Sequence, residues 1–275
     1  MNYNFNDNTL LHGISFNPMK LESILKYGLV SYNYAKKNNI LYAKNYNFTI
    51  DNNKLDSNLI NEMIENDAKD NIYLVRYLYV SDDPLSAYNL YIKNGISFII
   101  ENTNFIYDKD KELLKRSDEV VVKDNIPLSN IKGILLPNDY KDMLLKDVPI
   151  LPKNILNYNL IKENAISLVN YLKGYNYEVD TEELVYLLKD LGIANKSVNS
   201  LGKDNIDYND ALNDYKDIIN DINLFLSENV YLCFSNLLGK EATVYDMVEY
   251  INGKYNNLDI NIISEKGKRK WLRKN

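Results

Sequence analysis

Residues 10–29 contain the segment that most directly indicates the fold of the first half. They read Leu10-Leu-His-Gly-Ile-Ser-Phe-Asn-Pro-Met19 and Lys20-Leu-Glu-Ser-Ile-Leu-Lys-Tyr-Gly-Leu29. After the apolar start and His12-Gly13, apolar residues recur three and four positions apart, as on one face of a helix: Leu21, Ile24 and Leu25. Gly28 can adopt the left-handed conformation in which many helices end. The segment therefore predicts a strand, then a helix over 19–27 that ends at a glycine.

The rest of the first half alternates short apolar runs with turn-forming residues. Ile72 to Val80 is dense in apolar and aromatic residues, and Ser81-Asp-Asp-Pro84 after it is typical of a turn that caps a helix. Asp124-Asn-Ile-Pro127 is a second turn. The expected segments are helices at 56–67 and 85–93, and strands at 72–80, 96–100, 119–123 and 131–136. They predict an α+β domain over residues 1–148.

The second half has a helical pattern. Pro149 and Pro152 lie close together and indicate a linker. Beyond them, apolar residues recur at helical spacing, and Asp180-Thr-Glu-Glu183 is typical of a helix start. The expected helices are 161–172, 181–191, 211–226 and 243–251. We therefore expect a smaller all-α domain over residues 149–275.

Composition limits the class of protein. Of the 275 residues, 45% are hydrophobic and 25% are charged, as in soluble globular proteins. No apolar stretch is long enough for a transmembrane segment, and the start lacks the pattern of a signal peptide. We expect a cytoplasmic protein, with secretion by a route that needs no signal peptide, or a phage origin, left open. Cys233, the single cysteine, is expected in the core, and no metal site is expected.

Three short motifs give a more specific indication. His12, the only histidine, stands in His12-Gly-Ile-Ser15, and Gly28-Leu29 follows the first expected helix. Tyr79-Val-Ser-Asp-Asp-Pro-Leu-Ser-Ala-Tyr88 joins an expected strand to an expected helix. Glu119-Val-Val-Val122 opens another strand. In their order these motifs resemble the ADP-ribosyltransferase superfamily, in its histidine-tyrosine-glutamate branch typified by diphtheria toxin and the poly-ADP-ribose polymerases. The resemblance covers residues 8 to 138.

The resemblance implies a split β-sheet that binds NAD as a substrate. In this family pattern His12 would bind the adenosine-side ribose, and the Gly13 backbone would pair with the nicotinamide carboxamide. Tyr79 would stack on the nicotinamide ring. Glu119 would bind a hydroxyl of the nicotinamide ribose and stabilise the positive charge that develops on that sugar. One departure is Ile14, which moves the usual hydroxyl to Ser15. Ser15, Ser81 and Ser86 are further candidates for NAD binding.

The resemblance also bears on the acceptor of ADP-ribose. Arginine-directed members carry a second acid two positions before the glutamate, where this chain has Ser117, so an arginine target is disfavoured. Asp118 and Arg116 are candidate substrate contacts in the same loop. The net charge of −6 argues against a nucleic-acid acceptor and favours a protein. A bacterial toxin or effector is the expected biological type, with the helical half selecting the target or restraining activity, and an inhibitor or partner protein is left open.

Two alternatives remain, one enzymatic and one from another class. An RNA 2′-phosphotransferase-like enzyme of the same fold would need several arginines in a basic pocket, and the first 150 residues contain only Arg76 and Arg116. A binding protein that retains the fold without turnover is the second alternative. It differs from a transferase in that it would not consume NAD.

Overall fold

The structure is a computed structural model that describes residues 9–40, 70–76, 95–101, 119–137, 140–151, 156–255 and 261–264. The chain divides into two compact units. Residues 1–142 together with 245–275 form unit 1, and residues 143–244 form unit 2. Strands occur in unit 1 and long helices in unit 2, so the chain is a mixed α and β protein.

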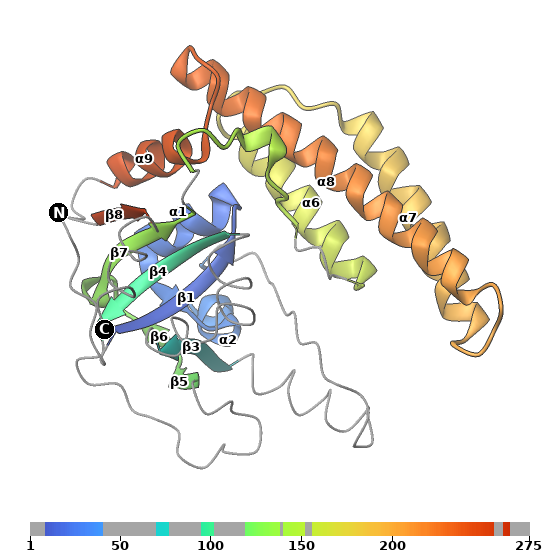
Figure 1. Cartoon of the computed structure of the whole chain (residues 1–275), viewed down its shortest axis with the longest axis horizontal. Helices are drawn as coiled ribbons and strands as arrows, with labels where there is room; N and C mark the ends of the chain where they lie inside the picture. Colours follow the sequence, from blue (N-terminus) through green and yellow to red (C-terminus); the bar gives the residue numbers. More distant parts are fainter. Residues whose placement is uncertain are drawn as a thin grey trace, which may run out of the picture. The chain divides into compact units, whose positions relative to one another are not determined.

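Unit 1 is built on a six-stranded sheet with the order β5-β3-β1-β4-β7-β8 (Figure 1). Neighbouring strands are antiparallel except β8, which runs parallel to β7. The core of the sheet includes Leu11, Leu74 and Phe98, whose side chains are fully buried. The strands are β1 Thr9–Ser15, β3 Asn71–Arg76, β4 Gly95–Glu101, β5 Glu119–Lys123, β7 Ile131–Leu136 and β8 Asn261–Ser264.

Helix α1 (Pro18–Tyr27) follows β1 directly and has a well-defined signal at each end. At its start the Asn17 side chain accepts a hydrogen bond from the Lys20 backbone N–H, and Pro18 fits the first turn because it has no N–H to satisfy. At its end Gly28 has a φ of 82° and donates its N–H to the Ile24 carbonyl. The strand, the helix and its end at Gly28 are therefore confirmed. With a ψ of −173°, Gly28 is not in the predicted left-handed helical conformation.

A second, two-stranded sheet lies after α1 in the chain. It pairs β2 (Leu29–Val30) with β6 (Asn125–Ile126) in antiparallel fashion. Of the turn predicted at 124–127, Asp124 forms a bend with a φ of 65°, whereas Asn125 and Ile126 are the paired residues of β6. The short elements that complete this part are α2 Tyr32–Lys37 and the 3-10 helix η2 Leu128–Asn130.

Most expected strands of the first half are confirmed. The strands over 119–123 and 131–136 have the predicted bounds, the strand at 96–100 extends over Gly95–Glu101, and the strand at 72–80 is described as Asn71–Arg76. The rest of that strand and the predicted helices at 56–67 and 85–93 lie outside the described residues.

The described part of unit 2 consists of three long helices, which Figure 1 shows side by side, and a short 3-10 helix before them. The amide of Asn223 on α8 holds the segment that enters this unit: its Oδ1 accepts from the N–H groups of Ile150 and Leu151, and its Nδ2 donates to the Leu151 carbonyl. The elements are η3 Leu145–Asp147, α6 Tyr158–Lys173, α7 Thr181–Leu201 and α8 Tyr208–Leu238. All three helices are longer than predicted, and the added part of α8 includes the buried residues Val230, Cys233 and Phe234.

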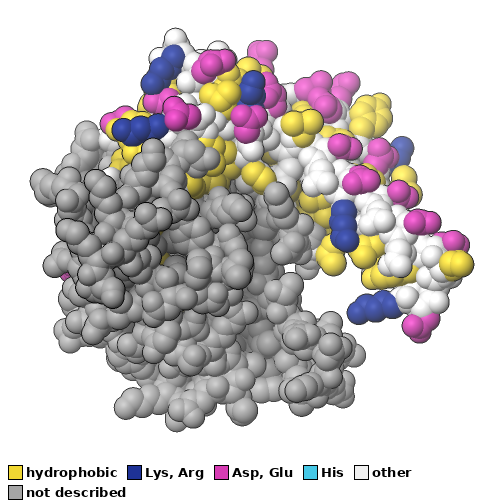
Figure 2. All heavy atoms as spheres, viewed as in Figure 1, with side chains coloured by type: hydrophobic (Ala, Val, Ile, Leu, Met, Phe, Trp, Pro, Cys, Tyr) yellow, Lys and Arg dark blue, Asp and Glu magenta, His cyan; other side chains and the backbone are white. Residues whose placement is uncertain are grey.

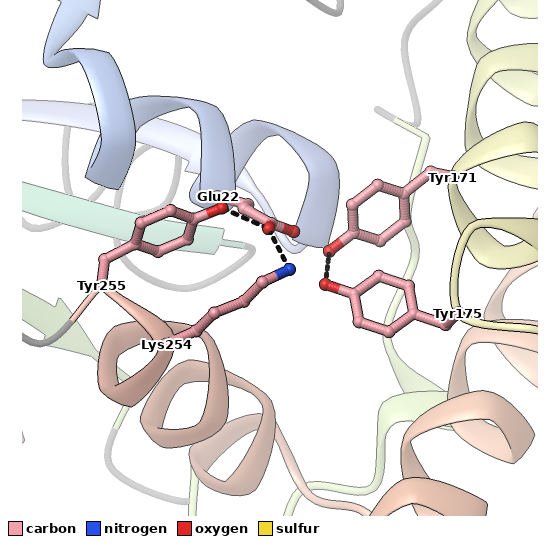
Figure 3. Close-up of polar contacts among 5 residues, drawn as sticks. All are labelled: Glu22, Tyr171, Tyr175, Lys254 and Tyr255. Carbon is pink, nitrogen blue, oxygen red and sulfur yellow. Dashed lines mark hydrogen bonds and ion pairs between the residues drawn. The ribbon is translucent and has the colours of Figure 1, made fainter.

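The end of the chain differs from the expected organisation. Residues 245–275 were assigned to the helical domain, but they belong with the sheet in unit 1. Strand β8 pairs with β7, with Ile262 opposite Ile134. Helix α9 (Val244–Lys254) is tied to α1, since Glu22 accepts hydrogen bonds from Lys254, at 2.6 Å, and from Tyr255 (Figure 3). The run Asn261-Ile-Ile-Ser264 is too short to identify as a strand without its partner β7.

Candidate functional site

The three motif-bearing strands are consecutive neighbours in the sheet. β1 contains His12, β3 leads toward Tyr79, and β5 begins at Glu119; the order β5-β3-β1 places β3 between the other two. Leu11 lies opposite Val75, and Val75 lies opposite Glu119. The backbone of Glu119 is thus in the same row as the residue before His12. Segments far apart in the sequence are brought together here by sheet pairing.

The strand directions place the end of β3 and the start of β5 beside the start of β1, whereas His12 and the residues after it run toward the other end of β1. β3 runs antiparallel to both β1 and β5, so its last residue, Arg76, lies opposite Leu10 near the start of β1, and β5 starts beside it at Glu119. Tyr79, Ser81 and Ser86 follow β3 in the sequence and lie outside the described residues, as do Arg116, Ser117 and Asp118. For Glu119 the structure describes the backbone only.

His12 is held in one tautomer by the neighbouring strand. Its Nδ1 lies 3.0 Å from the carbonyl oxygen of Tyr73 on β3. A carbonyl can only accept, so Nδ1 carries the hydrogen and donates it. Burial lowers the pKa of His12, the hydrogen bond to Tyr73 raises it in part, and the charge of Lys20 lowers it further. At neutral pH the imidazole is therefore uncharged, and Nε2 presents a lone pair that can accept a hydrogen bond from a hydroxyl.

The residues after His12 lie along the pairing of β1 with β4. Gly13 is opposite Ser97, and Ser15 is opposite Gly95. The two strands approach so closely at this end that a Cβ on Gly95 would overlap the carbonyl oxygen of Ile14. The Oγ of Ser15 is buried and makes no hydrogen bond in the structure. An unsatisfied buried hydroxyl is uncommon and leaves Ser15 able to bond to a ligand.

Lys20 is a polar residue of this region that the sequence patterns did not single out. It is only 8% exposed, and burial lowers the pKa of its amine to about 7. A signal was present in the sequence: Pro18 and Asn17 place Lys20 in the first helical turn, where the macrodipole disfavours a cation. Periodicity alone does not reveal this, since a lysine between two apolar residues usually lies on the exposed face of a helix.

Elsewhere the described residues offer fewer chemical features. They contain no group of three or more His, Cys, Asp or Glu side chains arranged to hold a metal ion. No described helix combines the length and apolar character needed to cross a bilayer. Cys233 is buried, as predicted, and burial raises the pKa of its thiol to about 11. A thiol with a raised pKa is a poor nucleophile, so Cys233 is part of the packing of unit 2.

Unit 2 has a groove between α6 and α7. Its floor includes Val169, Leu184 and Leu188, and three lysines line it as well, Lys162, Lys173 and Lys189. Among its apolar residues, Val185 is 62% exposed. Figure 2 shows hydrophobic side chains exposed among charged ones over the helices of this unit.

Comparison of the chain with protein-family models, with curated proteins and with solved structures finds no match.

Proposed function

We propose that this chain is an NAD-dependent ADP-ribosyltransferase of the histidine-tyrosine-glutamate type, with its two sheets forming the family's split β-sheet. The main support is that the strands carrying the three motifs, at His12, before Tyr79 and at Glu119, are direct neighbours in one sheet. Three unrelated chance matches to short motifs would not be expected to fall on three adjacent strands of one sheet.

The chemistry of His12 also supports a nucleotide-sugar ligand. Its Nδ1 is engaged by Tyr73, so the neutral ring can offer only Nε2, as an acceptor. A ribose hydroxyl can donate this hydrogen bond to Nε2. His12 would hold the adenosine-side ribose through this bond, with the Gly13 backbone and the Ser15, Ser81 and Ser86 hydroxyls as further NAD contacts.

The reaction breaks the bond between the ribose C1′ and the nicotinamide nitrogen. Nicotinamide leaves with the electron pair, and C1′ develops positive charge, which the Glu119 carboxylate would stabilise. Tyr79 would stack on the nicotinamide ring and orient it for departure. A nucleophilic atom of the acceptor then bonds to C1′ and releases its proton. The roles of Glu119 and Tyr79 are inferred from their sequence motifs.

A protein acceptor fits the chain better than a nucleic acid. The net charge of −6 provides no general attraction for phosphates. Ser117 replaces the second acid of arginine-directed members, so we propose a residue other than arginine as the target, with Arg116 as a substrate contact. We propose that the chain acts as a toxin or effector on a host or bacterial protein.

The test is Glu119→Gln. Glutamine keeps the size of the side chain and a hydrogen-bond acceptor, so NAD binding should be nearly unchanged, whereas loss of the charge should slow ADP-ribose transfer on the order of 100-fold or more. Transfer is measured with labelled NAD and a bacterial or host lysate, and NAD binding by calorimetry. Glu101→Gln, the same change at the end of β4, is the control and should transfer normally.

Three results would count against the proposal. Wild-type transfer by Glu119→Gln would remove the assigned role of the glutamate. A wild-type chain that binds NAD but neither transfers ADP-ribose nor hydrolyses NAD would be a non-catalytic binding protein. His12→Ala should chiefly weaken NAD binding, since a contact to the distant ribose acts on ground and transition states alike; unchanged binding by this variant would place the ribose elsewhere.

A further inference from the structure

Lys20 is a buried amine for which the described residues provide no counter-charge. Its side chain is 8% exposed, and among the described residues no carboxylate forms an ion pair with it. Burying an ammonium group away from water is costly unless it is paired, and buried lysines are therefore rare in proteins without a functional reason. The position makes the cost larger, since the first turn of α1 lies at the positive end of the helix dipole.

The groups around Lys20 do not offset this cost. The charge of Lys20 acts on His12, which is uncharged at neutral pH. Glu22, two residues further along α1, accepts from Lys254 and Tyr255 instead (Figure 3). Among the elements in contact with α1, β2 and η2 contain no ionisable side chain. Lys254 and Tyr255, which bond to Glu22, supply no negative charge. Thus the described protein groups leave the amine uncompensated.

We propose that the Lys20 amine binds a phosphoryl group of a sugar-phosphate ligand. A sugar hydroxyl of the same ligand donates a hydrogen bond to Nε2 of His12. The two groups require different partners: a protonated amine donates to an anion, and a neutral imidazole with Nδ1 engaged accepts from a hydroxyl. A ribose next to a phosphate carries both partners. The positive end of α1 adds to the attraction for the anion. That the ligand is the diphosphate of NAD rests on the proposed function; the site itself rests on Lys20 and His12.

This site couples ligand binding to proton uptake. In the free protein the Lys20 amine has a pKa of about 7, so it is largely neutral at higher pH. A bound anion favours the charged amine and raises its pKa, so above pH 7 the ligand binds together with a proton. Affinity therefore weakens as the pH rises above 7. His12 is neutral throughout this range, since its own pKa lies below the ordinary value, so Lys20 is the group that titrates.

The experiment measures binding by calorimetry with the full chain and three probes: ADP-ribose, ribose 5-phosphate and adenosine. Lys20→Met keeps the length of the side chain and removes the charge. It should weaken ADP-ribose binding about 10- to 100-fold, the usual effect of losing a charged hydrogen bond, and leave adenosine binding unchanged. Lys26→Met, the same change on an exposed residue of α1, is the control and should bind ADP-ribose like the wild type.

The pH arm separates a binding role from a structural one. ADP-ribose carries a fixed charge on its diphosphate in this range, so any change belongs to the protein. Between about pH 7 and pH 9 the wild type and Lys26→Met should lose affinity, by at most tenfold per pH unit, and Lys20→Met should not. Equal affinities for Lys20→Met and wild type, or a pH dependence that survives in Lys20→Met, would overturn the proposal.

The outcomes also distinguish this site from the enzymatic proposal. If ADP-ribose binding depends on Lys20 while the wild type transfers nothing, the site stands and the transferase assignment fails. If ribose 5-phosphate binds and ADP-ribose does not, the sugar-phosphate site stands and its assignment to NAD fails. If the wild type binds neither phosphate-bearing probe, the site itself is refuted, whatever the transfer assay shows.

Discussion

Removing the buried charge of Lys20 should stabilise unit 1 and weaken ligand binding. The Lys20→Met side chain has a similar length and is apolar, so it can occupy the same buried space without the desolvation cost of an ammonium group. A residue that lowers stability at its own position is expected where a binding site uses it. The stability of this variant is thus a measurement independent of any ligand.

The size of the effect follows from the pKa of Lys20. Burial lowers it from 10.5 to about 7 in the folded chain. At roughly 1.36 kcal/mol for each pH unit, holding the proton in the folded state below pH 7 costs up to about 5 kcal/mol. Between these two pKa values the unfolded chain binds a proton that the folded chain lacks, so wild-type stability increases with pH over this range. The advantage of Lys20→Met is therefore largest below pH 7 and shrinks toward pH 10.

Differential scanning calorimetry without ligand measures this dependence, because it can resolve separate transitions if the two units unfold independently. At about pH 6 the Lys20→Met transition should lie well above the wild-type transition, by up to about 20 °C, since 1 kcal/mol shifts the melting temperature by roughly 2–4 °C in domains of this size. Lys26→Met should follow the wild type at each pH. A Lys20→Met variant that melts at or below the wild-type temperature at about pH 6 would refute the reasoning, because Lys20 would then be compensated in the folded chain.

Three further substitutions test the packing of the two units. Asn223→Ala removes the acceptor of the Ile150 and Leu151 N–H groups, which lie 3.0 and 2.7 Å from its Oδ1. Chemical denaturation should show unit 2 less stable by about 2–4 kcal/mol. The control Asn220→Ala, at an exposed position of the same helix, should change the stability little. Gly28→Ala forces a Cβ against the Ile126 carbonyl at a φ of 82° and should destabilise unit 1 by more than about 1 kcal/mol. The control Gly253→Ala lies in open space on α9 and should be neutral or stabilising. Equal effects of the two substitutions would contradict the close approach of Gly28 to β6. Tyr215→Phe deletes a buried hydroxyl that has no hydrogen-bond partner in the structure, and should leave the melting temperature unchanged or raise it, in contrast to Tyr171→Phe, which breaks the 3.0 Å bond to Tyr175 (Figure 3).

Part of the candidate site was accessible from the sequence. The motif around His12 predicted a strand followed by a helix, and the motif at Glu119 predicted the first residue of a strand; both are found. The chemistry of the site was not accessible in the same way. The tautomer of His12 depends on Tyr73, which is 61 residues away in the chain, and the environment of Lys20 depends on elements that pack over α1. Such properties follow from contacts between distant segments and leave no local pattern.

The sequence by itself determined the individual elements. Strands such as 119–123 and 131–136, and the cores of α6, α7 and α8, follow from apolar periodicity and from turn and cap residues, which act over a few neighbouring positions. Only the tertiary structure decided the order β5-β3-β1, the return of β8 to the edge of β7, and the burial of Lys20. The physical reason is that strand pairing and burial depend on which distant surfaces meet, and each apolar run can satisfy its own period against several different partners.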